Sequence, residues 1–253
     1  MLGRKALSAL VVLVVLSLVL SACGATGSKK VVVATDATWA PFEFVDEATK
    51  EIVGFDIDLM KAIAKEGGFE IEFKNVGFDP LLAGMASGQY DAAISSITIT
   101  DERKKNMLFS DPYYAAGQLV VVQASNTTIK SQADLKGKKV GAQVGTTGAD
   151  EAKALGADLK TYDEIGSAYL DLVNGQVEAV VADNPLALGY VRKYAGKIKA
   201  AGAPFTAEQY GIAVKKGNTE LLAKINKGLK AVKDKGLIKE YETKWMDWFA
   251  KNQ

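Results

Sequence analysis

The chain has 253 residues, of which 48% are hydrophobic, so it is long enough to bury a substantial core. Its 31 basic and 30 acidic residues give a formal net charge of +1, which gives no indication of nucleic-acid binding. The sequence has no histidine, which excludes Ser-His-Asp triads and histidine metal sites, and its one cysteine excludes an intrachain disulfide. It also has no Walker-type loop or dinucleotide fingerprint, so we expect no metal and no cofactor.

Residues 1–22 have the pattern of a secretory signal. Arg4 and Lys5 precede an almost unbroken apolar run that ends in Leu20-Ser-Ala-Cys23. This ending resembles a bacterial lipobox, in which the cysteine is lipidated and becomes the mature N-terminus. An ordinary signal peptide or an uncleaved anchor helix is the alternative. Removing residues 1–22 removes two basic residues and no acids, so the formal charge changes from +1 to −1. We predict an extracytoplasmic protein that residues 23–29 tether to a lipid anchor.

From Lys30 onward, short apolar runs alternate with amphipathic stretches, as in an α/β fold. Asp56 can cap a first helix that ends at Gly67-Gly68, and Asp79-Pro80 opens a second helix that ends at Gly88. The predicted strands around these helices are 31–34, 70–76 and 91–95. This order predicts a mostly parallel sheet with helices on both faces.

The same alternation returns in the second half of the chain. Strands are predicted at 118–123, 138–143, 159–163 and 179–183. Helices are predicted at 165–174 and 185–194, and another follows Gly145-Thr-Thr-Gly148 and ends at Leu155. A late strand at 209–214 and a long helix with one apolar face follow. Two α/β sets predict two lobes, and residues 113–117 are a plausible first crossing between them. Small ligands usually bind in such a cleft, at the carboxyl ends of strands.

The segment 95–103 has the features of a carboxylate-binding site. It places three hydroxyl side chains at a strand end, and Thr100 or Asp101 can cap the helix that follows. Arg103 then lies in the first helical turn, where its guanidinium can bind a carboxylate through two hydrogen bonds. The helix N-terminus adds a favourable dipole. The alternative is an exposed helix start with Arg103 in a surface ion pair.

Several motifs give the chain a family resemblance. Ile97-Thr-Ile-Thr-Asp-Glu-Arg-Lys-Lys105, followed by Phe109-Ser-Asp-Pro-Tyr-Tyr114, is similar to the signature of the polar amino-acid-binding proteins of bacterial ABC importers. The resemblance continues through Ala34-Thr-Asp-Ala-Thr-Trp-Ala-Pro-Phe-Glu-Phe44, Gly54-Phe-Asp-Ile-Asp-Leu59 and Gln209-Tyr-Gly-Ile-Ala-Val214. It covers essentially the whole mature chain.

The resemblance implies an α/β fold of the type II periplasmic-binding-protein class. Each of its two lobes would be a mostly parallel sheet flanked by helices, with the ligand cleft between the lobes. A second crossing between the lobes is also implied. The expected division is lobe 1 from 30–112 plus 211–253, lobe 2 from 118–205, and crossings at 113–117 and 206–210.

The resemblance also implies roles for individual side chains. Asp36 would face the ligand side chain, with Trp39 and Phe78 on either side of it. Arg103 would hold the ligand carboxylate and Asp183 its α-ammonium group. The alternative is a capping role for the two aspartates and a core role for the two aromatic residues. The full predicted ligand set is Asp36, Trp39, Phe78, Ser95, Ser96, Thr98, Arg103, Gln143, Thr146, Thr147 and Asp183.

These features predict a monomeric, lipid-anchored receptor that closes on a polar L-amino acid and delivers it to an ABC permease in the membrane. Asp36, together with Gln143 where glutamine receptors commonly have lysine, favours arginine or lysine, and glutamine is the alternative. Two other classes remain. A cyclohexadienyl dehydratase-like enzyme is disfavoured by the lack of histidine and of an evident extra catalytic acid. A sensory ligand-binding module is disfavoured, because such modules usually continue into a transmembrane helix and a signalling domain and the given sequence stops at Gln253.

Overall fold

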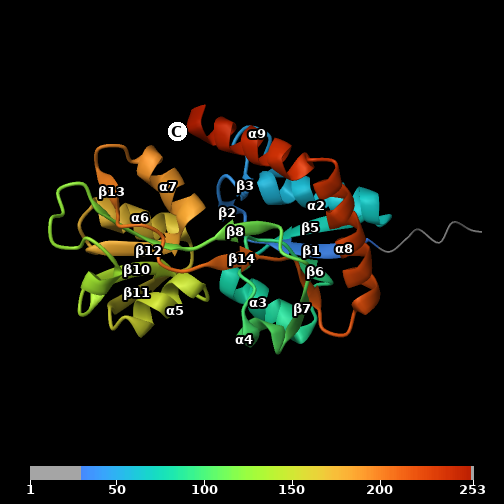
Figure 1. Cartoon of the computed structure of the whole chain (residues 1–253), viewed down its shortest axis with the longest axis horizontal. Helices are drawn as coiled ribbons and strands as arrows, with labels where there is room; N and C mark the ends of the chain where they lie inside the picture. The colour runs from blue at the N-terminus through green and yellow to red at the C-terminus, as the bar shows by residue number, and fades with distance from the viewer. Residues whose placement is uncertain (1–29, 252–253) are drawn as a thin grey trace, which may run out of the picture.

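The structure is a computed structural model that describes residues 30–251, so the predicted signal, Cys23 and the tether lie outside the described residues. Within this range no helix is both long enough and apolar enough to cross a membrane. The elements form two lobes side by side (Figure 1). Two short strands, β8 (Tyr114–Ala116) and β14 (Glu208–Tyr210), pair antiparallel and lie between the lobes.

Lobe 1 is built on a five-stranded sheet of order β5-β1-β6-β15-β7. Parallel pairing joins β1 to its neighbours β5 and β6, whereas β15 is antiparallel to both β6 and β7. A small sheet of β2, β3 and β4 follows β1. The strands are β1 (Val31–Thr35), β2 (Thr38–Trp39), β3 (Glu43–Val45), β4 (Ile52–Val53), β5 (Ile71–Asn75), β6 (Ala92–Ala93), β7 (Met107–Phe109) and β15 (Ala213–Lys215). The helices are α2 (Phe55–Gly67), α3 (Phe78–Ser87), α4 (Asp101–Lys104), α8 (Thr219–Asp234) and α9 (Leu237–Lys251).

Lobe 2 repeats this plan with the sheet order β11-β10-β12-β9-β13. Strands β11, β10 and β12 are parallel, and β9 is antiparallel to both β12 and β13. The strands are β9 (Gln118–Gln123), β10 (Lys139–Gln143), β11 (Asp158–Tyr162), β12 (Ala179–Asp183) and β13 (Ile198–Ala201). The helices are η1 (Gln132–Leu135), α5 (Thr147–Ala154), α6 (Ile165–Val173) and α7 (Asn184–Lys193).

The sheets are mixed, and this corrects the expectation that they would be mostly parallel. The reason lies in the crossings, because β9 and β15 each enter a sheet directly from the strand pair between the lobes. The predicted strand 209–214 is likewise two strands, β14 in the crossing and β15 in lobe 1. Gly211 lies at the break, where an added Cβ would come 2.7 Å from the side chain of Ile99. A side chain at this position would require the Ile99 side chain to move.

Two predicted helix starts also need correction. The N-cap of α2 is Gly54, at a φ of 132°, and Asp56 is a fully buried residue of the first turn instead of the cap. In α3 the N-cap is Gly77, so Pro80 occupies the third helical position instead of the first. The cap of α4 is Thr100, whose hydroxyl accepts a hydrogen bond from the Arg103 backbone N–H at 3.1 Å. This last assignment agrees with the expectation.

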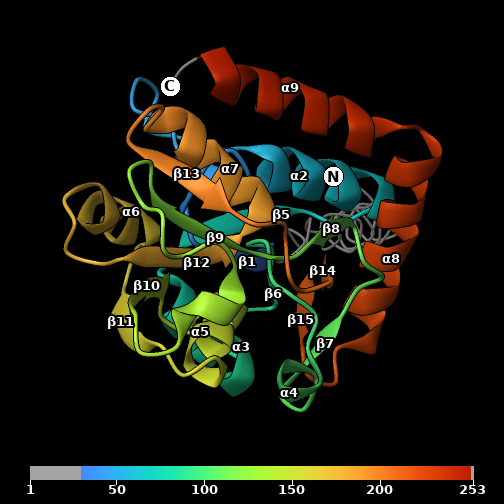
Figure 2. The same ribbon diagram turned by 60° about the vertical axis from the view of Figure 1, so that its left-hand side comes forward.

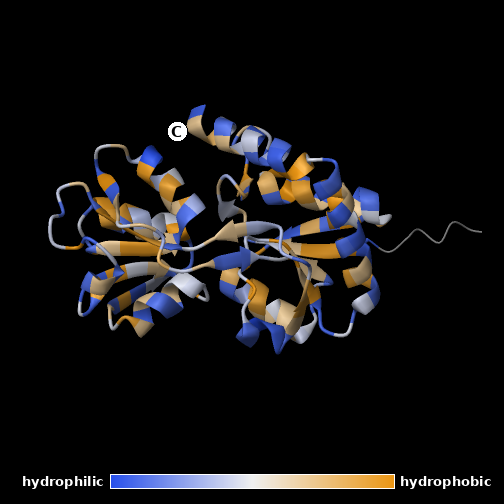
Figure 3. Cartoon of the chain, viewed as in Figure 1, coloured by the Kyte–Doolittle hydropathy of each residue, from blue (hydrophilic) through white to orange (hydrophobic). Residues whose placement is uncertain are grey.

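Figure 3 colours most of the strands as hydrophobic, whereas hydrophobic and hydrophilic residues alternate along the helices. In lobe 1 the largest apolar cluster joins the sheet to α2 and α8 through Val33, Leu59, Ile63, Ile225 and Leu229. The two helices approach closely, because a Cβ added to Gly228 would lie 2.2 Å from the backbone oxygen of Ile63. Burying each of these aliphatic side chains contributes about 1.5–3 kcal/mol to stability.

The C-terminal helix α9 runs alongside α2 and extends to lobe 2 (Figure 2). Its Phe249 ring packs on Gly189 of α7, where an added Cβ would lie 2.5 Å from a ring carbon. Lobe 1 therefore touches lobe 2 at this point as well as at the crossing.

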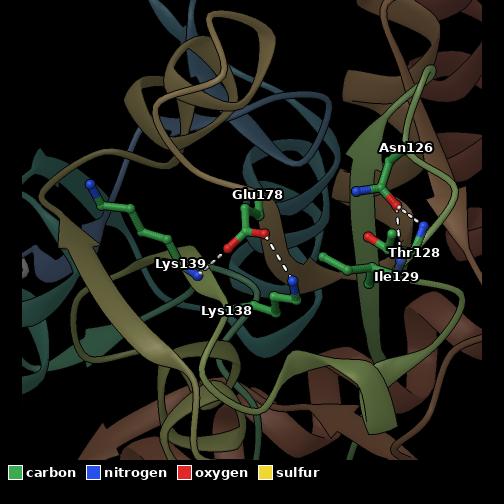
Figure 4. Close-up of polar contacts among 6 residues, drawn as sticks. All are labelled: Asn126, Thr128, Ile129, Lys138, Lys139 and Glu178. Carbon is green, nitrogen blue, oxygen red and sulfur yellow. Dashed lines mark hydrogen bonds and ion pairs between the residues drawn. The ribbon is translucent and has the colours of Figure 1, made fainter.

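Local polar contacts fix the outer loops of lobe 2 (Figure 4). Glu178 accepts hydrogen bonds from the Lys138 side chain at 3.2 Å and from the Lys139 backbone at 3.0 Å. The Asn126 side chain accepts from the backbone N–H groups of Thr128 and Ile129, at 3.0 and 2.9 Å. These contacts join the starts of β10 and β12 and form the turn after β9, away from the lobe interface.

Candidate ligand-binding site

Strand ends from both lobes meet at the interface. Asp36 follows β1 and Ser95 follows β6 in lobe 1, while Gln143 ends β10 and Asp183 ends β12 in lobe 2. All four strands belong to the parallel parts of their sheets. Ligands of open α/β sheets bind at this carboxyl edge, so the fold alone marks the interface as the candidate site.

One part of the interface, which we call the aromatic end, consists of Asp36, Trp39, Phe78 and Gln143. The rings of Trp39 and Phe78 are stacked, with centroids 6.1 Å apart. Gln143 reaches across the interface, where its Oε1 accepts from Trp39 Nε1 at 2.5 Å and its Nε2 donates to Asp36 Oδ2 at 2.7 Å. The Gln143 amide oxygen therefore faces Trp39, so it supports the aromatic end from lobe 2.

The Asp36 carboxylate is buried, with 1% of its surface exposed. Besides Gln143 it accepts a hydrogen bond from Thr38 Oγ1 at 2.9 Å. Burial raises the pKa of Asp36 above its ordinary value, while the hydrogen bonds from Thr38 and Gln143 act in the opposite direction. No lysine or arginine among the described residues forms a salt bridge with this carboxylate, so a cation beside it would be stabilised.

The other part, the charged end, consists of Thr98, Arg103, Thr147, Asp183 and Glu208. Arg103 spans the two lobes, donating from Nη1 to the Thr98 carbonyl at 2.8 Å and from Nη2 to the Gly145 carbonyl at 3.0 Å. Its guanidinium carbon lies 5.4 Å from the centre of the Phe78 ring, which connects the two ends. Among the described residues Arg103 forms no surface ion pair, so that alternative is wrong.

Asp183 is the buried acid of the charged end. Its two carboxylate oxygens accept from Gln118 Nε2 at 2.8 Å and from Tyr210 OH at 2.5 Å. Although it occupies the N-cap position of α7, its side chain makes no capping hydrogen bond, so the capping alternative is wrong. Burial, and then the neighbouring Glu208, raises the pKa of Asp183 to about 6.

Glu208 was not predicted, and it organises the charged end. Its Oε2 accepts from the hydroxyls of Thr98 at 2.6 Å and Thr147 at 3.0 Å, one from each lobe. Its Oε1 accepts from Gln118 Nε2 and Thr206 Oγ1, both at 3.0 Å. The sequence signal was a carboxylate inside the predicted crossing 206–210. Both threonine hydroxyls donate to Glu208, and that of Thr147 also accepts from Gln118 Nε2 at 3.1 Å, so each keeps at least one lone pair that can accept from a ligand.

The hydroxyls of Ser95 and Thr146 have structural partners instead of facing the interface. The Ser95 hydroxyl donates to Glu43 at 3.0 Å and accepts from the Asp36 backbone N–H at 2.9 Å. The Thr146 hydroxyl caps α5. Ser96 is held in a left-handed conformation at φ 48° by a 2.8 Å bond from its backbone N–H to Asp56. Ser95 and Thr146 therefore shape the site through these hydrogen bonds and Ser96 through its backbone, while the buried Ser96 hydroxyl has no partner in the described part of the chain.

A cavity of about 640 Å³ opens beside the charged end. Lobe 1 contributes Thr98 and Lys104 to its walls, lobe 2 contributes Thr147 and Glu151, and Glu208 comes from the crossing. This volume lies in the range of small-molecule sites. No cluster of residues suited to hold a metal ion is found within residues 30–251.

Comparisons with known proteins agree with this architecture. The model of the bacterial extracellular solute-binding proteins, family 3, matches residues 31–247, so the chain belongs to this family. Over 251 residues it is 37% identical to a probable histidine-binding protein of Neisseria gonorrhoeae, covering 93% of this chain and 92% of that protein. It is also 37% identical to ABC transporter arginine-binding protein 1 of Escherichia coli K12, covering 88% and 93%.

Solved structures give the same result for the fold. An ancestral arginine-binding protein bound to arginine is 48% identical, with a TM-score of 0.80 over 85% of this chain and 97% of that one. An ancestral arginine-binding protein bound to glutamine is 47% identical, with the same TM-score and coverage. An ancestral amino acid-binding protein described as a precursor of cyclohexadienyl dehydratase is 39% identical, with a TM-score of 0.78 over 85% and 95%. The protein is thus a two-lobed solute-binding protein.

Proposed function

We propose that this protein captures a basic L-amino acid, arginine first and lysine next, and delivers it to an ABC permease in the membrane. The main observation that supports this proposal is the balance of charges at the interface between the lobes. Asp36, Asp183 and Glu208 supply three carboxylates, and Arg103 supplies one guanidinium. A basic amino acid brings one net positive charge to this excess of negative charge, whereas glutamine brings none.

The charged end suits the backbone of an amino acid. The bonds from Arg103 to the two carbonyls use two of its five N–H donors, so others remain for a carboxylate. Burial lowers the pKa of Arg103, and the charge of the neighbouring Asp183 raises it. The Asp183 carboxylate suits the α-ammonium group of an amino acid. The Thr98 hydroxyl and the remaining lone pair of the Thr147 hydroxyl can accept from the same ammonium group. All of these contacts are shared by every L-amino acid.

The aromatic end suits a cationic side chain. Trp39 and Phe78 offer ring faces to an aliphatic stem or a guanidinium plane, which contributes about 0.5–2 kcal/mol. Asp36 supplies the charge that compensates the desolvation of that cation. Glutamine remains the second candidate, because its amide can hydrogen-bond to Asp36 and Gln143. A relative with 47% identity is described as an arginine-binding protein bound to glutamine.

We propose that the protein is a transport receptor and not an enzyme, because each charged side chain at the interface already has a proposed role in ligand binding. A dehydratase-like activity remains the alternative of another class. Incubation with cyclohexadienyl acids is expected to give no turnover, and turnover that Asp183→Asn abolishes would support the enzyme instead.

We also propose that the protein works as a monomer held at the outer face of the cell membrane through lipidated Cys23. Stable anchoring needs more than one acyl chain, as a lipoprotein cysteine provides. Cys23→Ala is expected to release the protein or leave it as uncleaved precursor. A fully processed Cys23→Ala protein that still fractionates with membranes would contradict the lipid anchor.

A thermal-shift screen against the standard L-amino acids tests the proposed function. A ligand at about 100 times its Kd stabilises the fold by about 2.7 kcal/mol. Arginine and lysine are expected to give the largest shifts, glutamine a smaller one, and acidic amino acids none. A screen in which no amino acid shifts the transition would contradict the proposal.

A further inference from the structure

A pair of buried carboxyl groups lies directly beneath the Ser95–Ser96 segment. Glu43 comes from β3 and Asp56 from the first turn of α2, and both are fully buried. Glu43 Oε1 accepts from the Ser95 hydroxyl at 3.0 Å. Asp56 Oδ2 accepts from the Ser96 backbone N–H and from Tyr113 OH, both at 2.8 Å. The segment at the end of β6 and the start of the first crossing are thus both attached to this pair.

The other oxygen of each carboxyl group has no donor. Glu43 Oε2 and Asp56 Oδ1 are buried polar atoms without a hydrogen-bond partner in the described part of the chain. A buried acceptor left unpaired costs free energy, and two unpaired acceptors on adjacent acids have one common remedy. A single proton placed between them makes one oxygen a donor and the other its acceptor.

The surroundings of the pair favour this proton. The ionisable groups that face it are Asp36 from the end of β1, Tyr113 at the crossing and Tyr114 on β8, and none of them is a cation. Burial raises the pKa of Glu43 well above its ordinary value, with the Asp56 charge as the next cause. Burial also raises the pKa of Asp56, to about 7. Two adjacent carboxylates without a compensating cation do not both ionise.

We propose that Glu43 and Asp56 share one proton, between Glu43 Oε2 and Asp56 Oδ1, and that this protonated pair positions the Ser95–Ser96 segment for ligand binding. The shared proton would give each of the two unpaired oxygens a partner, because one carboxyl group then donates to the other. Glu43 and Asp56 touch no ligand in this account and act as positioning residues. The ligand-binding part of the inference rests on the proposed function.

The pair acts on the site through short connections. Ser96 has a left-handed backbone conformation that a non-glycine residue adopts only when it is held, and the bond to Asp56 holds it. The Ser95 hydroxyl joins Glu43 to the Asp36 backbone N–H at 2.9 Å, and Asp36 belongs to the aromatic end. Loss of the shared proton would leave two like charges in a dry interior, and their repulsion would displace the carboxylates together with the segments bonded to them.

Glu43→Gln tests the shared proton, because the glutamine amide donates to Asp56 at every pH. A group whose folded pKa is raised contributes stability that is complete at low pH and is lost as the pH rises through the folded pKa. The melting temperature of the wild type is therefore expected to fall more steeply from about pH 5 to about pH 9 than that of Glu43→Gln. The matched control, Glu47→Gln on the exposed loop after β3, is expected to follow the wild type.

The difference in melting temperature between Glu43→Gln and wild type should thus grow with pH, and a difference independent of pH would overturn the shared proton. Should Glu43→Gln not fold, the reciprocal Asp56→Asn variant offers the same fixed donor. Infrared spectroscopy of the wild type gives a measurement without any variant. A protonated-carboxyl band that persists at neutral pH is expected, and its absence would overturn the proposal.

Rescue by the conservative variant tests the positioning role. At neutral pH, Glu43→Gln is expected to bind arginine within about threefold of the wild type, whereas Glu43→Leu loses at least about tenfold. Equal losses in both variants would overturn the positioning role. If the wild type binds no amino acid, the proposed function fails, and the melting and infrared measurements still decide whether the proton is shared.

Discussion

The two ends of the interface differ in how completely their charges are compensated. At the charged end, Arg103 lies between Asp183, Glu208 and the backbone carbonyls of both lobes, so charges of both signs are present before a ligand is considered. At the aromatic end, Asp36 has hydrogen bonds only from neutral groups, Thr38 and Gln143. This difference supports our proposal that the charged end binds what all amino acids share and that the aromatic end selects among their side chains.

The largest effect is expected from Arg103→Ala. Its removal leaves the ligand carboxylate without a charged partner in a desolvated site, which costs about 2–5 kcal/mol of binding free energy. The division of roles predicts equal losses for arginine and glutamine, measured by calorimetry. Lys105→Ala, an exposed residue directly after the same short helix, is the matched control and should leave both affinities unchanged. A loss of affinity for arginine alone would contradict the proposal that the charged end binds the groups shared by all amino acids.

Gln143→Lys is expected to produce the next largest effect, restricted to cationic ligands. A lysine at this position places a second positive charge beside Asp36 and repels a bound guanidinium by about 2 kcal/mol, for a separation of roughly 8 Å at an effective dielectric constant of about 20. Arginine affinity should fall and glutamine affinity should change little in competition titrations. Gln143→Met, of similar length and neutral, separates this repulsion from the loss of the Trp39 contact. If Gln143→Lys and Gln143→Met weaken arginine to the same extent, repulsion is not the cause.

Protonation of Asp183 should weaken binding of every amino acid at low pH. Its pKa is raised to about 6, so the ionised form that holds the α-ammonium group is lost below that pH. Affinity is then expected to fall by about tenfold per pH unit, or about 1.4 kcal/mol. Stability changes in the opposite direction, because the contribution of this raised pKa is complete at low pH and is lost as the pH rises through about 6.

Titrations across this pH range, paired with melting curves, check both signs. Asp183→Asn should bind weakly at all pH values and lose the acid limb of the affinity profile. A wild-type affinity that stays constant below pH 6 would place the α-ammonium group on another residue.

The smallest effect is expected from Glu208→Gln. The variant keeps one acceptor oxygen but replaces the other with an amide donor, so it cannot accept from all four present donors. Arginine affinity is expected to fall by about 1 kcal/mol. Glu151→Gln removes a carboxylate from the wall of the same cavity and serves as the control for charge alone. Equal effects of the two variants would show that Glu208 acts only through its charge.

Much of the fold could be predicted from the sequence, because apolar runs and helix-ending glycines in the sequence agree with the strands and helices inside the two lobes. The apolar run 179–183 forms β12 with those bounds, and Gly88 ends α3 in a left-handed conformation as expected. The strands that were missed are short, such as β2 and β8, and depend on partners far along the chain. Their periodicity is too brief to read, and the mixed sheets result from these same long-range pairings.

The site was predictable to the extent that motifs name residue types at strand ends. Asp36, Trp39, Phe78 and Arg103 lie at the interface, and their contacts with a ligand stay a prediction. What the sequence did not provide were partners distant in the chain. Glu208 accepts a hydrogen bond from Thr98, which is 110 residues away in the chain. Glu43 lies beside Asp56, which the sequence analysis expected only to cap a helix. Hydrogen-bond partners of this kind depend on the folded geometry.

The central claim is that the uncompensated charge of Asp36 selects a cationic ligand, and paired titrations of arginine and glutamine on wild type and Asp36→Asn test it most directly. Wild type should bind arginine more tightly than glutamine. Asp36→Asn should weaken arginine by about 2 kcal/mol or more and glutamine by much less, because only arginine loses an ion pair. A wild type that prefers glutamine, or a variant that loses both ligands equally, would contradict the claim.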